Sequence, residues 1–364
     1  MKKSPREPAG PAPGRQDPGP QDLVAAPGAV SAELERLRAG HDRRRYVPLR
    51  EIARGGMGLV LHVWDEVLRR PLAMKVLELD GGGSDAGAAA RFLAEAQIAG
   101  ALQHPAIVPI HDLGVDDDGR LYFTMPLIEG RDLGAVFDLA LTRSEGWSLV
   151  RAVQALASVC DVIAYAHSRG VIHRDLKPAN VLVGRFGGIH VLDWGLAQLV
   201  GPPPAAQAAG AEGGGVSVAG IAGTPPWMAP EQAEGGGAQV SCRTDVYALG
   251  ALLHRLLTGR APYVSTRMPA DPAKLLELIR RGPPTPLARL APDAPRALIA
   301  CATRAMQRRP EDRQARVEDL AEELQVFLEG KGGHREGFRL ALGGVAGRFR
   351  AGVRGVARRG VSGA

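Results

Sequence analysis

The chain has 364 residues, of which 45% are apolar and 23% charged, so two or three ordinary globular domains fit its length. Its net charge of +6 comes from the ends: residues 1–45 carry +3, residues 331–364 carry +7, and the body between them carries −4. This argues against a body built to bind nucleic acid, and three widely spaced cysteines without a CxxC pair argue against a disulfide framework or a cysteine zinc site.

Residues 1–30 begin the chain with seven prolines and almost no large apolar side chains, which predicts disorder. Ser31 is placed to cap a short helix. The first residues lack the apolar stretch of a signal peptide, and the best apolar run, residues 246–257, is too short to span a membrane. We therefore expect a cytoplasmic protein without a transmembrane helix.

From Tyr46 the chain changes to short β-strand patterns separated by turns. The predicted elements, in chain order, are strands over residues 47–50, 59–64 and 72–77, a helix over 88–102, and strands over 107–113 and 121–125. These elements predict a five-stranded sheet with one helix, within a small lobe over residues 46–129.

After Gly130 the chain is mainly helical. The predicted helices cover residues 149–167, 245–257, 272–280, 296–307 and 317–328, with a Gly/Ala/Pro-rich insert at 201–220. They predict a larger helical lobe over residues 130–329, flanked by the loose segments 1–45 and 330–364.

The strongest local signal is the run His173-Arg-Asp-Leu-Lys-Pro-Ala-Asn180. Its acid, Asp175, precedes a lysine by two residues and an amide by five, so the three side chains can converge when the loop folds over them. Phosphoryl transfer needs this set: an acid to orient a hydroxyl, a cation near the moving phosphoryl group, and a neutral oxygen ligand for Mg²⁺. Because all eight residues of this run fit a single sequence motif, we prefer this interpretation to that of an ordinary polar loop.

This run resembles the catalytic loop of the protein kinases, and further kinase motifs follow the family's order over residues 46–328. The GGMG and APEQ sequences are similar to those of bacterial, eukaryote-like (Hanks-type) serine/threonine kinases. The resemblance implies an α+β fold with two lobes, a small five-stranded antiparallel β lobe with one helix and a larger, mainly helical lobe. It also implies ATP and Mg²⁺ or Mn²⁺ as cofactors.

The resemblance assigns the chemistry residue by residue. Asp175 matches the catalytic base, Lys177 the lysine that contacts the γ-phosphate, and Asn180 a Mg²⁺ ligand. Asp193, in Asp193-Trp-Gly195, matches the second Mg²⁺ ligand, and Trp194 replaces the family's usual phenylalanine.

Upstream, the resemblance predicts a nucleotide site. Lys75 on the third strand and Glu95 on the helix match the ion pair that holds the α- and β-phosphates. Ala53 departs from the family's first glycine, which we expect to alter ATP affinity at most. The predicted ATP-binding residues are Ile52, Ala53, Arg54, Gly55, Gly56, Met57, Gly58, Leu59, Val60, Ala73, Lys75, Met125, Ile128, Asp132 and Leu182.

Lysine usage supports the same assignment independently. Between residues 46 and 329 the chain has three lysines, Lys75, Lys177 and Lys274, and otherwise carries its positive charge as arginine. Two of the three occupy kinase positions. A compact ammonium is not interchangeable with arginine's planar group at a crowded phosphate site.

The segment Gly223-Thr-Pro-Pro-Trp-Met-Ala-Pro-Glu231 resembles the end of a kinase activation segment. The resemblance implies that Thr224 packs against the catalytic residues, as in serine/threonine kinases, and that Glu231 pairs with Arg313. It further implies that Asp245 braces the catalytic loop. Arg174 matches a reader of activation-loop phosphate, for which Ser217 and Thr224 are the candidate sites.

Two alternatives to an active serine/threonine protein kinase stay open at this point. A pseudokinase scaffold would bind nucleotide or partners without turnover, and a small-molecule kinase would share the fold. The expected partners are protein substrates and a second copy of the chain for phosphorylation in trans. The basic tail is a solubilising segment, an arm for an anionic surface or acidic partner, or a remnant of a membrane-tethered architecture.

Overall fold

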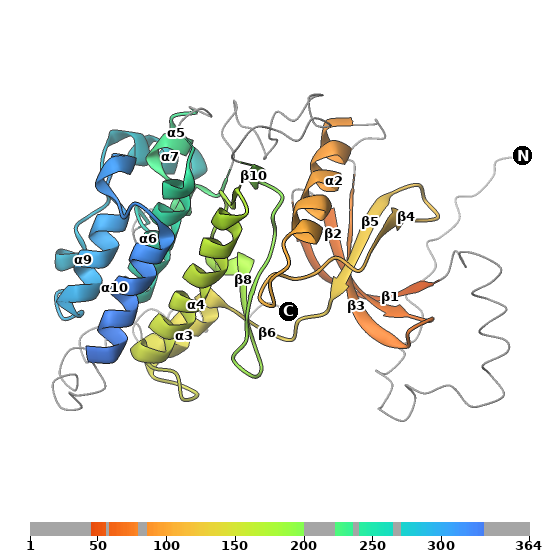
Figure 1. Ribbon diagram of the computed structural model, residues 1–364, viewed down its shortest axis with the longest axis horizontal. Coiled ribbons are helices and arrows are strands. Elements are labelled where there is room, and N and C mark those ends of the chain that lie inside the picture. Colours follow the sequence, from red (N-terminus) through yellow and green to blue (C-terminus); the bar gives the residue numbers. More distant parts are fainter. Residues whose placement is uncertain are drawn as a thin grey trace, which may run out of the picture. The chain divides into compact units, whose positions relative to one another are not determined.

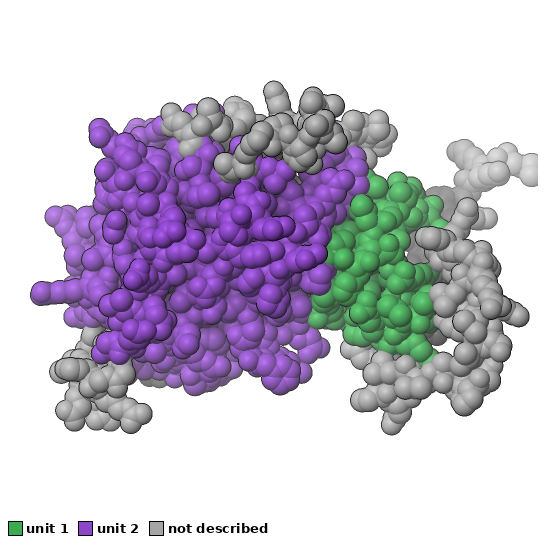
Figure 2. All heavy atoms as spheres, in the orientation of Figure 1, with its two compact units in different colours: residues 1–84, 110–127 green, residues 85–109, 128–364 purple. Residues whose placement is uncertain are grey.

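The computed structural model describes residues 45–55, 58–78, 86–199, 223–235, 240–264 and 271–330. The chain divides into two compact units, unit 1 (residues 1–84 and 110–127) and unit 2 (residues 85–109 and 128–364), coloured separately in Figure 2. It passes from unit 1 to unit 2 between Leu127 and Ile128. The predictions for the N-terminal segment, Gly56, Met57, Ser217, the insert and the basic tail lie outside the described residues.

Unit 1 contains one antiparallel sheet, visible in Figure 1, with the strand order β1-β2-β3-β5-β4. The strands are β1 (Tyr46–Gly55), β2 (Gly58–Asp65), β3 (Arg70–Val76), β4 (Asp112–Val115) and β5 (Leu121–Pro126). The predicted five-stranded antiparallel sheet is therefore confirmed.

Alternation along these strands gives the sheet two different faces. One face packs around Val63, Leu72, Met74 and Val76, which are nearly inaccessible to solvent. The residues that alternate with these along the strands lie on the opposite face. They include Val60, Ala73 and Lys75. The predicted nucleotide-binding side chains of β2 and β3 thus lie mainly on the face opposite this apolar cluster.

Unit 2 is mainly helical, as predicted for the larger lobe, but it also contains the helix that we expected within the small lobe. Its helices are α2 (Ala86–Ala101), α3 (Leu133–Thr142), α4 (Leu149–Ser168), α5 (Pro230–Ala233), α6 (Cys242–Thr258), α7 (Pro272–Arg281), α8 (Leu287–Leu290), α9 (Arg296–Ala305) and α10 (Val317–Gly330). Short strands and turns between them are β6 (Gly130–Asp132), β7 (Val171–Ile172), η3 (Pro178–Asn180), β8 (Val181–Gly184), β9 (Ile189–Val191), β10 (Gln198–Leu199), η4 (Pro225–Trp227) and η6 (Pro310–Asp312).

Two helices form the centre of unit 2. α6 is buried on nearly all sides, and Ser241 caps its start by accepting a hydrogen bond from the Arg243 N–H. α4 packs against α6, α10 and α3, and its side chains Leu156, Val159 and Ile163 are fully buried. The rigid elements that carry the loops of unit 2 are therefore these two helices.

α4 also corrects one expectation about membrane spans. Among the described helices it alone is long and apolar enough to cross a membrane, with a mean hydropathy of 1.5 over its best stretch. More than half of that stretch, 56%, is buried inside the structure, as in the core helix of a folded unit. The best candidate by length and composition is therefore α4 and not the apolar run at 246–257. Its length and apolar composition are only weak evidence for a membrane span.

Two other local predictions were wrong. The strand predicted over residues 107–113 begins only at Asp112, because Ile107 instead bridges Val191 within unit 2 and Pro109 has no N–H to donate. Helix α3 was not predicted; it begins at the Asp132 cap, whose carboxylate accepts a hydrogen bond from the Ala135 N–H at 2.9 Å.

Candidate active site

The predicted catalytic loop lies in unit 2 between β7 and η3, and Asp245 of α6 holds its backbone. The Asp245 carboxylate accepts hydrogen bonds from the N–H groups of His173 (2.8 Å) and Arg174 (2.9 Å). Asp245 is completely buried, so these bonds form away from competing water. The start of the loop is thus fixed by a carboxylate on the central helix.

His167, at the end of α4, is a member of this arrangement that the sequence did not reveal. Its Nε2 lies 2.8 Å from Oδ2 of Asp245. Burial alone would lower the pKa of His167, but hydrogen bonds to Asp245 and Cys242 outweigh burial and raise this pKa to about 10. The charged imidazole and its hydrogen bond in turn lower the pKa of Asp245, although burial opposes this. A charged His167–Asp245 pair therefore supports the loop.

Asp175 is the centre of the polar cluster that follows. Its Oδ1 accepts hydrogen bonds from both the N–H and the hydroxyl of Thr224, at 3.0 and 2.9 Å. Its Oδ2 lies 2.6 Å from Nζ of Lys177, and this amine also donates to the Thr224 hydroxyl at 3.0 Å. Three predicted residues from two distant segments of the chain thus meet at one carboxylate.

Asn180 extends the cluster toward the predicted metal ligands. Its Nδ2 donates to the backbone oxygen of Asp175 (2.9 Å) and to Oδ2 of the same residue (3.3 Å). The Leu192 N–H donates to the backbone oxygen of Asn180 at 2.8 Å, which brings the residue before Asp193 to Asn180. With the amide nitrogen committed to Asp175, the side-chain oxygen of Asn180 is the atom left to act as a ligand.

The backbone at Asp193 is unusual, with φ of 61° in the left-handed region. Arg174, next to Asp175, also has a positive φ, of 67°. Non-glycine residues in this region cost on the order of 1–3 kcal/mol and cluster at functional sites, although aspartate tolerates the conformation better than most. One outlier, Asp193, is itself a predicted metal ligand, and the other, Arg174, adjoins the predicted catalytic base.

A Mg²⁺ ion fits the donor set of Asn180 and Asp193. Among the described residues no group of three or more His, Cys, Asp or Glu side chains could hold a metal by itself. One amide and one carboxylate oxygen, completed by phosphate oxygens and water, match the preference of Mg²⁺ for sites that share ligands with a substrate. The two predicted ligands therefore suit a metal that arrives with a nucleotide.

Arg174 has an incompletely paired side chain. Its Nε is buried and has no hydrogen-bond partner among the described residues. Burial lowers the pKa of Arg174, partly offset by the charge of Asp245. A partly buried guanidinium with an unused donor suits an incoming anion.

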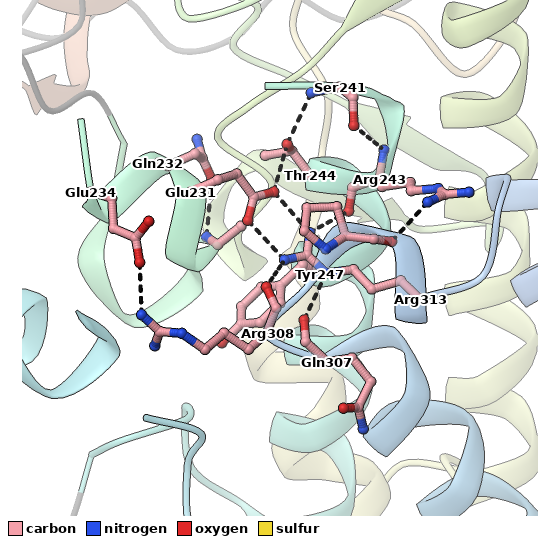
Figure 3. A network of polar contacts seen from close by, with 12 residues as sticks. Glu231, Gln232, Glu234, Ser241, Arg243, Thr244, Tyr247, Gln307, Arg308 and Arg313 are labelled. Atoms are coloured by element: carbon pink, nitrogen blue, oxygen red, sulfur yellow. Dashed lines mark hydrogen bonds and ion pairs between the residues drawn. The ribbon is translucent and has the colours of Figure 1, made fainter. Parts of the chain in front are cut away.

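Glu231 and Arg313 form a further ion pair, shown in Figure 3. The pair is bidentate, with distances of 2.8 and 2.7 Å, and both side chains are almost fully buried. Glu231 also accepts a hydrogen bond from the Thr244 hydroxyl at 2.9 Å. The structure thus brings together the two residues that the sequence paired, and ties α5 to α6 and to the turn before α10.

In unit 1, four of the predicted nucleotide-site residues, Val60, Ala73, Lys75 and Met125, share one face of the sheet. Lys75 lies on β3 with its Nζ 5.8 Å from the centre of the Phe123 ring, and Ala73 pairs with Met125 across β3 and β5. Gly58 has φ of 140°, and a Cβ there would lie 2.1 Å from the Val76 backbone oxygen. This close approach explains why glycine is needed at that position.

The remaining predicted nucleotide-site residues of unit 1 do not all lie on this face. Ile52 and Ala53 are exposed on β1, and Arg54 forms ion pairs with Glu51 and Glu78. Leu59 pairs with Val76 and so belongs to the other face. Gly55 is described and pairs with Gly58.

Asp132 and Leu182 are direct partners on the β6–β8 ladder of unit 2, whereas Ile128 begins that unit. The predicted Lys75–Glu95 ion pair and the complete nucleotide site take residues from both units, and both stay predictions. The same holds for the roles assigned to the individual site residues.

Comparisons with known proteins agree with these motifs. Residues 46–323 match the family model described as the protein kinase domain. The chain is 30% identical over 301 residues to serine/threonine-protein kinase PknD of Protochlamydia amoebophila, covering 79% of this chain and 30% of that protein. It is 35% identical over 274 residues to PknH of Mycobacterium tuberculosis (75% and 40%), and 34% identical over 306 residues to PknD of Chlamydia trachomatis (79% and 32%).

The chain spans less than half the length of these curated relatives. The family match nevertheless covers most of the chain and includes every motif that the sequence singled out from Tyr46 to Arg313. The chain therefore belongs to the protein kinase family, among the bacterial Hanks-type serine/threonine kinases that its motifs resemble.

Proposed function

We propose that this chain transfers the γ-phosphoryl group of ATP to serine and threonine hydroxyls of proteins. The observation that carries the proposal is the convergence of Lys177 and Thr224 on the Asp175 carboxylate, within 2.6–3.0 Å. A carboxylate held by a cation and a hydroxyl is positioned to orient a third group, the substrate hydroxyl, that enters the same cluster.

In the proposed reaction, the substrate hydroxyl oxygen attacks the γ-phosphorus of ATP, the bond from that phosphorus to the β,γ-bridging oxygen breaks, and ADP leaves. Asp175 accepts the hydroxyl proton. Lys177 supports the charge that develops on the transferred group, and Lys75 holds the α- and β-phosphates. Asn180 and Asp193 would hold Mg²⁺ or Mn²⁺, which neutralises phosphate charge when bound.

Thr224 favours serine and threonine as acceptors in this proposal. Its hydroxyl bridges Lys177 and Asp175 in the way the resemblance implied. The same two bonds make Thr224 a poor phosphorylation site, because a phosphate there would place negative charge against Asp175. We therefore favour Ser217 as the residue modified in trans, with Arg174 as the group that pairs with its phosphate.

Protein substrates are the main partners in this proposal, and the basic tail is a candidate contact to anionic surfaces. We place the kinase domain in the cytoplasm, where ATP is available and where the free thiols of Cys160, Cys242 and Cys301 stay reduced.

The test is a phosphotransfer assay with the purified chain, ATP, Mg²⁺ or Mn²⁺ and a basic protein substrate, followed by phosphoamino-acid analysis. We expect phosphoserine and phosphothreonine without phosphotyrosine. Lys75→Met and Lys177→Met should each lower turnover. Lys274→Met is the matched control, because Lys274 is 64% exposed on α7 and pairs only loosely with Asp271, at 3.8 Å. Nucleotide binding without any phosphotransfer would contradict the proposal and favour a pseudokinase.

A further inference from the structure

His62, on β2 of unit 1, is a buried polar residue to which no motif assigns a role. Its side chain is 4% exposed, and its Nε2 has no hydrogen-bond partner among the described residues. Buried polar atoms in folded proteins are nearly always paired, so an unpaired one indicates strain or a partner that binds later.

The strand register places His62 among residues predicted to bind the nucleotide. It pairs directly with Ala73 on β3, which pairs in turn with Met125 on β5. Directly opposed residues point to the same face of a sheet, as do residues two apart on one strand, such as Val60 and His62. His62 therefore belongs to the face that carries Val60, Ala73, Lys75 and Met125.

Among these five residues of the face, only His62 and Lys75 have a nitrogen atom in the side chain. Lys75 is the predicted phosphate ligand, and it lies two residues beyond Ala73, roughly 6.7 Å along the strand. His62 stands level with Ala73, which the kinase resemblance places against the purine, and with Met125. The face thus has an ammonium at its phosphate end and an imidazole at its base end.

We infer that His62 is a base-contacting residue of the nucleotide site, with its Nε2 forming a hydrogen bond to the purine of bound ATP. This inference rests on the proposed function, since it assumes that the nucleotide occupies this face. An imidazole suits the task because it can donate or accept, and a purine edge presents both kinds of group. Binding the nucleotide then satisfies the atom that is unpaired in the nucleotide-free chain.

The test compares His62→Leu with the unaltered chain in two binding titrations, one with Mg-ATP and one with Mg-tripolyphosphate, which has the phosphates but no base. We expect His62→Leu to weaken ATP binding by about 3- to 10-fold, the usual worth of one neutral hydrogen bond, and to leave tripolyphosphate binding unchanged. His62→Gln, which keeps a polar group, should recover part of the loss.

Thr124→Val is the matched control. The Thr124 side chain is also buried, but Thr124 pairs with Met74 and so belongs to the opposite face. Its substitution should leave both titrations unchanged. Thermal unfolding of each nucleotide-free variant reports folding, and His62→Gln carries the test if the leucine variant does not fold.

Two results would overturn the inference: equal ATP affinity of His62→Leu and the unaltered chain, or an equal loss of ATP and tripolyphosphate binding. These outcomes are separate from failure of the proposed function. An unaltered chain that binds ATP but transfers no phosphoryl group, with a base-selective loss in His62→Leu, would refute the activity and support the contact.

Discussion

Two ion pairs of unit 2, Arg313–Glu231 and Lys177–Asp175, hold their charges in different ways. Arg313 uses all five of its N–H groups, two on Glu231 and the others on the backbone oxygens of Arg243, Gln307 and Arg308. Its side chain is fully buried. Nothing in this arrangement is left to bind a further group.

Lys177 and Asp175 are arranged more loosely. The Lys177 side chain is 23% exposed, and among the described residues its ammonium donates to two groups, Asp175 and Thr224, although it has three N–H bonds. One donor is thus available for an incoming phosphate. We infer from this comparison that the saturated pair braces the fold, whereas the unsaturated pair keeps a donor for a ligand.

The largest effect should come from the unsaturated pair. Asp175→Asn keeps the size of the side chain but removes the proton acceptor, so turnover should fall by roughly 10²- to 10⁴-fold while ATP still binds. A phosphotransfer assay and an ATP titration measure the two quantities. The exposed Asp293→Asn is the control for the same chemical change. Parent-level turnover in Asp175→Asn would remove the proposed role.

The saturated pair should affect stability instead. Arg313→Met leaves the buried Glu231 carboxylate without its partner, which should lower the free energy of unfolding by about 3–5 kcal/mol. Denaturant titration checks this, and the same variant should keep a normal ATP affinity if it is assayed while folded. A loss below about 1 kcal/mol would show that the Glu231–Arg313 pair drawn in Figure 3 contributes little to stability.

The His167–Asp245 pair should produce a smaller, pH-dependent effect. Because the pKa of His167 is raised to about 10, its contribution to stability is complete below its ordinary value near 6.5 and is lost as the pH rises through 10. Asp245, with its lowered pKa, stays charged over this range. The stability difference between the parent and His167→Gln should therefore shrink between pH 7 and 10.5, by at most about 1.4 kcal/mol per pH unit. Parallel stability curves for the two proteins would contradict the assignment.

The smallest effect should come from a surface pair on α7. Arg281 and Glu277 are 71% and 57% exposed, so solvent screens their attraction. Arg281→Met should change the free energy of unfolding by no more than about 0.5 kcal/mol, measured by denaturant titration beside Arg313→Met. A loss as large as that of Arg313→Met would mean that burial does not separate the two kinds of pair.

Prediction from the sequence was most successful where the functional residues lie close together along the chain. Asp175, Lys177 and Asn180 lie within six residues, so one loop suffices to bring them together, and the five-stranded sheet follows from alternating apolar runs between turns. Distant partners such as Glu231 and Arg313 were paired through the family resemblance alone, since 82 residues separate them.

Prediction from the sequence failed where contacts between distant segments determine the role or the position of a residue. His167 gains its role from Asp245, 78 residues away, and no local motif marks it. The apolar run from Ile107 has the composition of a strand, but its first residues pack in unit 2 instead of entering the sheet of unit 1. His62 is visible only once the register shows which face it shares.

The hold of Asp245 on the catalytic loop has a consequence for sequence variation. Its carboxylate binds the backbone N–H groups of residues 173 and 174, which every amino acid except proline possesses. The two hydrogen bonds that locate the loop therefore do not depend on the side chain at position 174. The proposed response of Arg174 to phosphate can be lost by substitution while these bonds still hold the residues proposed to perform the chemistry, so control can diverge between related chains while the reaction is kept.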